Sequence, residues 1–353
     1  MATPTILGLD IGGANLKAAT PDKRAVSVPF PLWKQPDKLP AALAELVAKF
    51  PDAEELAVTM TGELCDCYET KREGVSSIIA AVRFASGGRR MSVWSTDGVF
   101  VDSEEAKRNH MKVAAANWHA LATLAGQYVP RRPGVLIDIG STTTDIVPLL
   151  DGKPCPQGKT DRERLRFSEL VYTGARRTPI CAVLGSQVAA EYFATAHDAY
   201  LLLGKVSEKA TDCDTADGRP ATREFAHARL ARMLGGDAET VSLQDATFLA
   251  SDVMDKQIRL IEYGIIATIS HLATLSRSNR SSQPVEFLLS GSGEFIAREL
   301  FSRDFKCPTR LGTISCTTVD PNNIRSLSDQ LGPEVSACAP AYAVAVLAAE
   351  SRS

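Results

Sequence analysis

Short apolar runs that end in polar, glycine-rich turns recur along this chain, and they predict buried strands. The runs that begin at Thr5 and Leu136 both lead into Asp-Ile-Gly, at 10–12 and 138–140, and a second apolar run follows each turn. Runs of this length bounded by turn residues are typical of strands buried in a sheet. Other runs predict strands at 16–20, 25–28, 54–60, 91–94, 99–101 and 285–290.

Helical spacing of apolar residues separates these strands. In the segment 40–50, Leu43, Leu46, Val47 and Phe50 share one helix face. The same spacing predicts helices at 74–85, 103–128, 183–194, 224–234, 243–276 and 339–349. Asp151-Gly152 predicts a hairpin turn, and we interpret 162–166 as a charged connection. Strands that alternate with helices in this way predict an α/β protein.

A linker divides the chain. Pro130-Arg-Arg-Pro133 breaks regular structure just before the second Asp-Ile-Gly run. We therefore expect an N-terminal domain at 1–130 and a second domain at 131–338, with the terminal helix at 339–353 packing back on the first domain.

The two Asp-Ile-Gly turns suit phosphate. Small residues let backbone N–H groups approach an anion, hydroxyls add donors, and a carboxylate at the strand end can hold Mg²⁺. One such turn is structural about as often as functional, but a repeat favours a duplicated molecule with its ligand between the lobes. A third strand ends in a similar Gly-Ser-Gly turn. The candidate phosphate-binding residues are Gly12, Gly13, Asn15 and Lys17, then Gly140, Ser141, Thr142, Thr143, Thr144 and Asp145, and finally Gly291, Ser292 and Gly293.

Three such turns in this order resemble the phosphate-1, phosphate-2 and adenosine motifs of the superfamily of actin, sugar kinases, Hsp70 and the hydantoinase/oxoprolinase proteins. The resemblance implies two ribonuclease-H-like α/β domains that face each other across a cleft.

Composition narrows the class of partner. The 353 residues are 44% hydrophobic and 23% charged with a net charge of −3, so no basic excess favours nucleic acid or an anionic membrane. No leader pattern and no run of about 18 apolar residues stands out, which predicts a cytoplasmic protein. The eight scattered cysteines predict reduced thiols rather than disulfides or a zinc site.

Carboxylates at strand ends are the first chemical candidates. Asp10 and Asp138 can meet across a cleft around a metal–phosphate group, and both are predicted metal ligands. Asp145 can join them or can hydrogen-bond its own turn. Lys17 can reach a phosphate as a point charge, or it can be a solvated strand lysine.

Three other polar segments carry open alternatives. If 63–69 is helical, Glu63, Asp66 and Glu69 share one face, which is either functional or solvated. The loop 212–218, with Asp217, can hold Mg²⁺ or form a plain Asp-Gly turn. The segment 172–179 can bind an anion or form a surface turn, and it supplies Thr173, Gly174 and Arg177.

Taken together, the blocks at 9–17, 59–75, 138–145, 170–179 and 215–218 resemble the tetrahydromethanopterin-linked one-carbon transfer pathway protein family, of hydantoinase/oxoprolinase type. The resemblance implies methanofuran biosynthesis by condensation of an aminomethyl-furanmethanol diphosphate with the phenol of γ-glutamyltyramine, with release of pyrophosphate. It implies small-molecule partners and Mg²⁺ held by Asp10 and Asp138. Glu63 or Asp217 would accept the phenol proton.

Two other functions stay open. An ATP-dependent small-molecule kinase would use the same turns for ATP, although no aspartate is placed convincingly as a base for a sugar hydroxyl. A nucleotide sensor without catalysis would need only binding. The sequence does not distinguish tyramine from tyrosine, the number of glutamates, the host, or a monomer from a homodimer.

Overall fold

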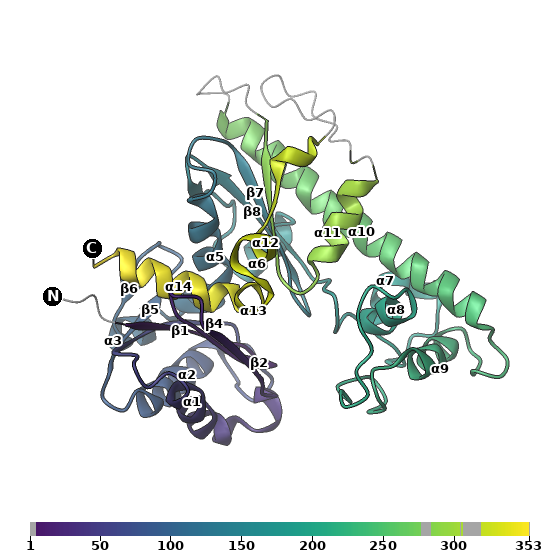
Figure 1. The fold of residues 1–353 in the computed structure, drawn as a ribbon, viewed down its shortest axis with the longest axis horizontal. Coiled ribbons are helices and arrows are strands. Elements are labelled where there is room, and N and C mark those ends of the chain that lie inside the picture. The colour runs from purple at the N-terminus through teal and green to yellow at the C-terminus, as the bar shows by residue number, and fades with distance from the viewer. Residues whose placement is uncertain (1–4, 277–283, 304, 306–318, 353) are drawn as a thin grey trace.

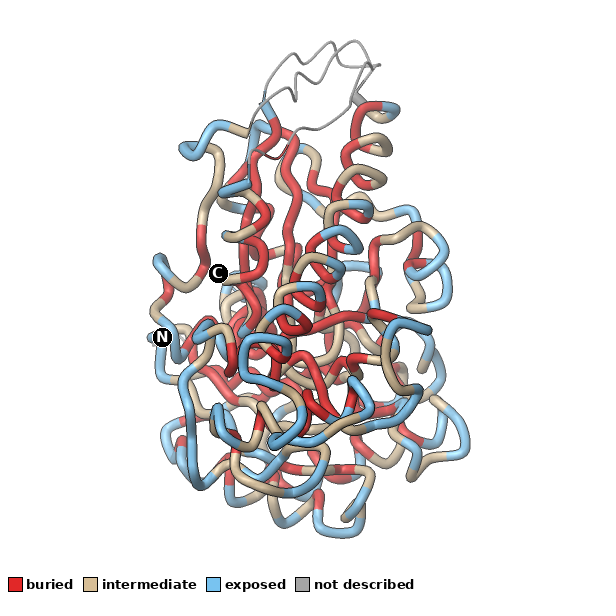
Figure 2. The backbone as a smooth tube through the Cα atoms, turned by 90° about the vertical axis from the view of Figure 1, so that its right-hand side faces the viewer, coloured by how far each residue is buried: buried red, intermediate tan, exposed pale blue. Residues whose placement is uncertain are grey.

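The computed structural model describes residues 5–276, 284–303, 305 and 319–352. Two mixed β-sheets are separated by a layer of helices, and further helices cover their outer faces (Figure 1). Buried backbone is concentrated in the strands and in the helices packed against them (Figure 2). The predicted α/β fold with two lobes is confirmed.

The first sheet has the strand order β3-β2-β1-β4-β5-β6. An antiparallel β1-β2-β3 meander opens it, and β4 and β5 then add in parallel. Its outer face packs on two helices, α1 (Leu39–Ala48) and α2 (Lys71–Ala85). The strands are β1 (Ile6–Ile11), β2 (Asn15–Ala19), β3 (Ala25–Pro29), β4 (Glu55–Met60), β5 (Arg90–Trp94) and β6 (Phe100–Val101).

The second sheet has the order β10-β8-β7-β11-β12, with β9 paired to β8. It repeats the antiparallel hairpin of the first sheet in β7 and β8, and β11 then adds in parallel beside β7. Its outer face packs on α10 (Leu243–Ser276) and α11 (Glu294–Ser302). The strands are β7 (Gly134–Ile139), β8 (Thr144–Leu150), β9 (Lys153–Pro154), β10 (Leu170–Val171), β11 (Glu286–Ser290) and β12 (Ile324–Ser326).

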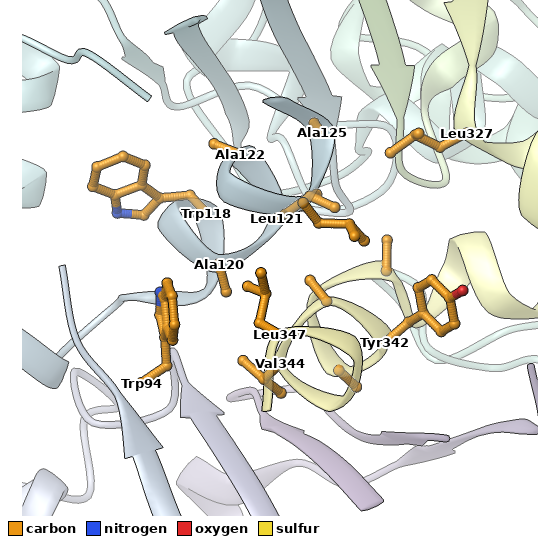
Figure 3. Close-up of a cluster of buried hydrophobic side chains, with 14 of the residues drawn as sticks. Trp94, Trp118, Ala120, Leu121, Ala122, Ala125, Leu327, Tyr342, Val344 and Leu347 are labelled. Carbon is orange, nitrogen blue, oxygen red and sulfur yellow. The ribbon is translucent and has the colours of Figure 1, made fainter. Parts of the chain in front are cut away.

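Helices α5 (Asn117–Gly126) and α14 (Ala339–Glu350) form the middle layer. Their side chains, such as Leu121 and Val344, pack together between the sheets (Figure 3). Inward-facing residues of both sheets, such as Ile6 and Leu136, belong to the same core. The alanine-rich sequence of α14 lets it lie very close to β1. A Cβ at Gly8 would come 1.9 Å from the carbonyl oxygen of Ala341, so only glycine fits there.

The strand pattern decides which side chains face this middle layer. In β1, Leu7, Leu9 and Ile11 belong to the outer core, so Asp10 shares the inner face with Ile6. In β7, Val135, Ile137 and Ile139 belong to the outer core, so Asp138 shares the inner face with Leu136. Alternation therefore turns both aspartates toward the space between the lobes.

A helical unit stands apart from the sheets, on the right of Figure 1. Helices α7 (Ile180–Leu184), α8 (Ala196–Leu202) and α9 (Arg223–Met233) pack on the N-terminal half of α10 around their own apolar core. Helix α10 is long and apolar enough to cross a membrane by length and composition alone, but core helices meet the same test. Its inner residues, including Ile261 and Ile265, pack in the core of the second lobe.

Several predicted elements differ from the structure. The expected helix at 103–128 is divided into α3 (Ser103–Arg108), α4 (His110–Val113) and α5, with Ala115 at a φ of 48° before α5. The helix expected at 183–194 is wrong, because α7 ends at Leu184 and Gly185 takes a φ of 60°. The charged segment expected as a connection is helix α6 (Asp161–Arg166), which begins with a Thr160/Glu163 capping box.

The remaining helices are α12 (Leu327–Leu331) and α13 (Pro333–Ala337), which lead from β12 into α14. Short 3₁₀ turns occur at Leu32–Lys34, Pro36–Lys38, Gly185–Gln187 and Pro321–Asn323.

Candidate functional site

A cavity of about 530 Å³ lies between the two lobes, at the strand ends where the glycine-rich turns were predicted to bind phosphate. Both lobes contribute to its walls. Of the predicted site residues, the following line it: Asp10, Gly12, Gly13, Asn15, Lys17, Glu63, Asp138, Gly140, Ser141, Thr142, Thr143, Asp145, Arg177, Gly291 and Ser292.

The first hairpin places a carboxylate beside an ammonium. Asp10 in β1 lies directly opposite Lys17 in β2, so their side chains leave the sheet on the same face. Asp10 is 4% exposed, and its Oδ1 has no hydrogen-bond partner. Burial raises the pKa of Asp10, and the nearby charge of Lys17 partly opposes that rise. A buried carboxylate oxygen without a partner is suited to a cation that arrives with the ligand.

The second hairpin repeats this geometry with a different partner. Asp138 in β7 lies opposite Asp145 in β8, and Ser290 of β11 lies beside Asp138 on the other side. Burial, and then the charge of Asp145, raise the pKa of Asp138 to about 6, and the nearby Ser290 hydroxyl lowers it without completing a hydrogen bond of normal geometry. Asp10 and Asp138 line the same cavity from opposite lobes, and the charge of Asp10 also raises the pKa of Asp138.

Arg164 of α6 neutralises Asp145. The Arg164 Nη1 donates to Asp145 Oδ1 at 2.7 Å, and Nη2 donates to the carbonyl oxygen of Glu169 at 2.9 Å. The guanidinium also lies 3.9 Å from the centroid of the Trp118 ring, on α5. Only 1% of the Arg164 side chain is exposed. The sequence predicts a charged connection here, and no apolar pattern in 162–166 indicates a buried side chain.

Other predicted residues pack against the far side of the turn at 140–143 and do not line the cavity. A Cβ at Gly174 would lie 2.6 Å from the backbone nitrogen of Thr142, so the chain passes directly under the turn. Thr144 donates its hydroxyl to the carbonyl oxygen of Thr173 at 2.7 Å. Gly293 packs against Ile139 in the same way. These four residues (Thr144, Thr173, Gly174 and Gly293) shape the turn without facing the ligand space.

Glu63 lies just after β4 and is the most unusual acid in the cavity wall. Its side chain is 1% exposed, and neither carboxylate oxygen completes a hydrogen bond of normal geometry. Burial raises its pKa to about 7, against smaller opposing effects of Lys71 and of the backbone N–H groups of Glu63 and Ala115. A carboxylate with this pKa can both hold and release a proton near neutral pH.

The other two acids of the segment 63–69 do not lie beside Glu63. Residues 61–70 form turns and not a helix, so Asp66 and Glu69 do not share a face with Glu63 and are exposed. The expectation of three aligned carboxylates is therefore wrong.

The acidic loop near Asp217 does not reach the cavity. Asp217 forms ion pairs with Arg219 at 2.6 Å and with the buried Arg229 at 3.0 Å. Asp212 is paired with Arg176 at 2.8 Å. Because arginines already neutralise these carboxylates, we withdraw both the magnesium site in this loop and the proposed role of Asp217 as proton acceptor.

Arg177 connects the two lobes beside the cavity. It lines the cavity from the second lobe, and its guanidinium lies 4.8 Å from the centroid of the Trp33 ring in the first lobe. Sequence reasoning had placed Arg177 at an anionic ligand but gave no indication of Trp33.

The predicted metal ligands, Asp10 and Asp138, can be compared with what magnesium requires. Among the described residues, no group of three or more His, Cys, Asp and Glu side chains could hold a metal by itself. Magnesium needs no such group when it binds through one or two carboxylates together with substrate phosphates. Asp10 and Asp138, with the unpartnered Oδ1 of Asp10, match that requirement. The six described cysteines are free thiols, and Cys307 and Cys316 lie outside the described residues.

Known proteins resemble this chain over nearly its whole length. A protein of Methanocaldococcus jannaschii described as "(4-{4-[2-(gamma-L-glutamylamino)ethyl]phenoxymethyl}furan-2-yl)methanamine synthase" is 33% identical over 354 residues, which covers 97% of each chain. A protein of Methanococcus vannielii with the same description is 31% identical over 221 residues, covering 60% of this chain and 89% of that one.

One solved structure supports the fold, and a second resembles the chain less closely. A nucleotide-free acetone carboxylase matches with a TM-score of 0.50 at 11% identity, covering 98% of this chain and 70% of that one. An archaeal actin homologue, Ta0583, gives a TM-score of 0.43 at 13% identity, covering 99% of this chain and 100% of that one.

The family assignment rests on sequence. The model of the hydantoinase/oxoprolinase family matches residues 54–317, well over half of the chain. Together with a relative that is 33% identical across 97% of both chains, this match shows that the chain belongs to the hydantoinase/oxoprolinase family.

Proposed function

We propose that this chain is a transferase of methanofuran-type cofactor biosynthesis. It joins a furanmethyl diphosphate to the phenol of a γ-glutamyl-tyramine or γ-glutamyl-tyrosine and releases pyrophosphate. The relative of Methanocaldococcus jannaschii carries the name of a synthase whose product has this phenoxymethyl-furan linkage. The single observation in the structure that carries the proposal is the cavity in which two phosphate-type turns face each other beside the buried acid Glu63.

The diphosphate would bind between the two turns. The Gly12 N–H is bound to the carbonyl oxygen of Asn15, so Lys17 is the donor that the first hairpin brings to the cavity, while Ser141, Thr142 and Thr143 offer hydroxyls from the opposite lobe. Lys17 supplies positive charge to both buried aspartates, because it lies directly opposite Asp10 in the hairpin and lines the same cavity as Asp138. Donors from both lobes would fix the leaving group before the C–O bond breaks.

Asp10 and Asp138 would hold the magnesium ion. Bound there, Mg²⁺ supplies positive charge that offsets the charge developing on the diphosphate leaving group. The rise in the pKa of both aspartates follows from burial without a cation, and a bound cation would favour their ionised forms.

Glu63 would accept the phenol proton. The bond from the furanmethyl carbon to the diphosphate oxygen breaks, and its electron pair leaves with pyrophosphate. The phenol oxygen forms the new C–O bond to that carbon, and its proton passes to the Glu63 carboxylate. A phenol with a pKa of about 10 needs such a base, and the pKa of Glu63, about 7, suits the task.

Mass spectrometry of the reaction tests the proposal. The purified protein is incubated with Mg²⁺, the furanmethyl diphosphate and glutamyl-tyramine or glutamyl-tyrosine, without ATP, while pyrophosphate is measured. We expect the ether and pyrophosphate in equal amounts, and the better acceptor identifies the phenol. No ether, but phosphoryl transfer once ATP is added, would reject this function in favour of a kinase.

A further inference from the structure

Lys71 lies between two carboxylates that belong to different lobes. It is the first residue of α2 in the first lobe, where Thr70 caps the helix. Its Nζ lies 2.8 Å from Asp161 Oδ2 and 3.9 Å from Glu63 Oε1. The ammonium is therefore engaged by Asp161 at full hydrogen-bond distance, and it only approaches Glu63.

Asp161 reaches Lys71 from the opposite wall. It is the first residue of α6, directly after the Thr160 cap, and it lines the cavity. The end of α6 is well fixed, because Thr160 and Glu163 form a capping box and Arg164 of the same helix is buried against Asp145 and Trp118. A rigid helix start thus presents the Asp161 carboxylate to Lys71 across the cleft.

Without Glu63 and Asp161, the position of the Lys71 ammonium would be electrostatically unfavourable. A cation at the N-terminus of a helix is opposed by the helix dipole. Only 20% of the Lys71 side chain is exposed, so water compensates it incompletely. Its placement there is accounted for by the carboxylates on either side.

The groups that face Glu63 come from several elements. Lys71 of α2 lowers the pKa of Glu63, whereas Asp161 of α6 raises it. Cys65, in the same loop, and Tyr172, after β10, are the other titratable groups close enough to feel its charge. Both are neutral near pH 7, because burial raises the pKa of each above its usual value. Lys71 is thus the cation that decides whether Glu63 is paired or free.

We propose that Lys71 and Asp161 act as a positioning pair: by binding the ammonium from the opposite lobe, Asp161 withholds it from Glu63 and leaves that carboxylate able to accept a proton. This inference rests on the proposed function and deepens it. When the lobes separate, Lys71 loses Asp161 and pairs with Glu63, so the acid is a weak base. When the lobes close on substrate, Asp161 binds the Lys71 ammonium again. Glu63 then loses its cation and becomes a stronger base while the phenol is bound.

The pH dependence of kcat tests this relay, because it reports the protonation of Glu63 in the closed substrate complex. In Asp161→Asn, the ammonium turns to Glu63, and we expect the acidic midpoint of the profile to fall by about 1 pH unit. In Lys71→Met, Glu63 loses its cation, and we expect the midpoint to rise. Lys71→Arg should restore the original midpoint, since the guanidinium can reach the same two carboxylates.

A second ion pair between the lobes provides the matched control. Lys159 lies 3.4 Å from Asp97 across the cleft but does not line the cavity. Lys159→Met should leave the midpoint unchanged. Equal shifts in Lys159→Met and Asp161→Asn would overturn the proposal, because closure alone would then explain the effect.

The double variant separates a relay from a direct effect. Asp161→Asn also removes a negative charge near Glu63, which by itself lowers the midpoint. If Asp161→Asn lowers the midpoint as strongly in the Lys71→Met background as in the wild type, Asp161 acts without Lys71 and the relay is wrong. A clearly smaller shift in that background supports it.

A measurement that does not depend on catalysis tests this inference separately from the proposed function. Infrared pH titration of the carboxyl band that Glu63→Gln removes reports the Glu63 proton directly. A smaller Asp161→Asn shift in the Lys71→Met background than in the wild type would support the relay even if the wild type made no ether. Unchanged titration in both variants would reject it even if the wild type were active.

Discussion

The two hairpins that open the lobes have one backbone design and two different charge arrangements. In each, an aspartate on the central strand faces inward and meets a polar residue directly across the hairpin. In the first hairpin this residue is Lys17, which remains in the cavity beside Asp10. In the second it is Asp145, whose charge would add to that of Asp138 if nothing opposed it.

The two lobes place their cation differently with respect to the aspartate. The first lobe keeps its ammonium in front of the aspartate, in the cavity, where a phosphate oxygen can meet it. The second lobe neutralises its extra acid from α6, with an arginine that is buried and stacked on Trp118. The same strand register therefore supports ligand binding in one lobe and internal stability in the other.

Arg164→Met should have the largest effect on stability. It leaves Asp145 buried without a partner, and breaking a buried ion pair on one side costs about 3–5 kcal/mol. Urea unfolding measures this loss. Arg162→Met, on the exposed side of the same helix, should change stability by less than about 0.5 kcal/mol. A small loss in Arg164→Met would show that Arg164 is not needed to offset Asp145.

Asp10→Asn and Asp138→Asn should each slow pyrophosphate release about 10²–10³-fold, the size expected for losing a main electrostatic stabiliser of the leaving group. The reason is the same in both lobes, because each aspartate would hold the metal from one side. Steady-state rates over a range of Mg²⁺ concentrations measure the effect. The exposed Asp66→Asn is the control and should be near wild type. Undiminished rates in both cavity variants would refute the shared metal site.

Glu63→Gln should lower kcat about 10²-fold through loss of the base. Since the pKa of Glu63 is about 7, the wild-type rate should rise with pH through that value as the carboxylate forms, and Glu63→Gln should lack this limb. A profile unchanged in Glu63→Gln would assign the proton to another acceptor. The exposed Glu69→Gln serves as control and should behave as wild type.

The same residue predicts a pH effect on stability. The folded-state pKa of Glu63 is raised above the unfolded value, so its favourable contribution is complete below about pH 4.3 and is lost as pH rises through about 7. Glu63→Gln removes this loss. Near pH 8 the variant should therefore unfold at a higher temperature than the wild type, whereas no difference in thermal unfolding would mean that the carboxylate is not buried as described.

Lys17→Met should have the smallest effect, an increase of about tenfold in KM for the diphosphate substrate, because one charge-assisted contact is lost. The wild type and the variant are compared in initial-rate assays. Lys49→Met, on the surface at the end of α1, should not change KM. An effect of Lys17→Met on kcat alone would place the ammonium at the transition state rather than at the bound diphosphate.

The fold was largely predictable because alternation and strand-end turns are local signals. The duplicated Asp-Ile-Gly runs gave both central strands, and their inward-facing aspartates followed from the strand period. The helix expected at 183–194 failed because apolar spacing there competes with Gly185, whose φ of 60° ends α7.

The site was less predictable because its electrostatics depend on contacts between lobes. Asp217 resembled Glu63 in sequence as an acid near a turn, but its neighbours in space are Arg219 and Arg229. Lys71 and Asp161 lie 2.8 Å apart, yet no local pattern connects two helix starts so distant in the chain. Partners of this kind are fixed by the packing of α6 and α2, which the sequence does not reveal residue by residue.

The most direct test of the account is isothermal titration of pyrophosphate, with and without Mg²⁺, into the wild type, Asp10→Asn and Asp138→Asn. We predict one pyrophosphate per chain, bound in a Mg²⁺-dependent manner and weakened by both substitutions, because the two hairpins hold the same ligand from opposite lobes. Binding that neither substitution weakens, or binding of ATP but not of pyrophosphate, would contradict the account.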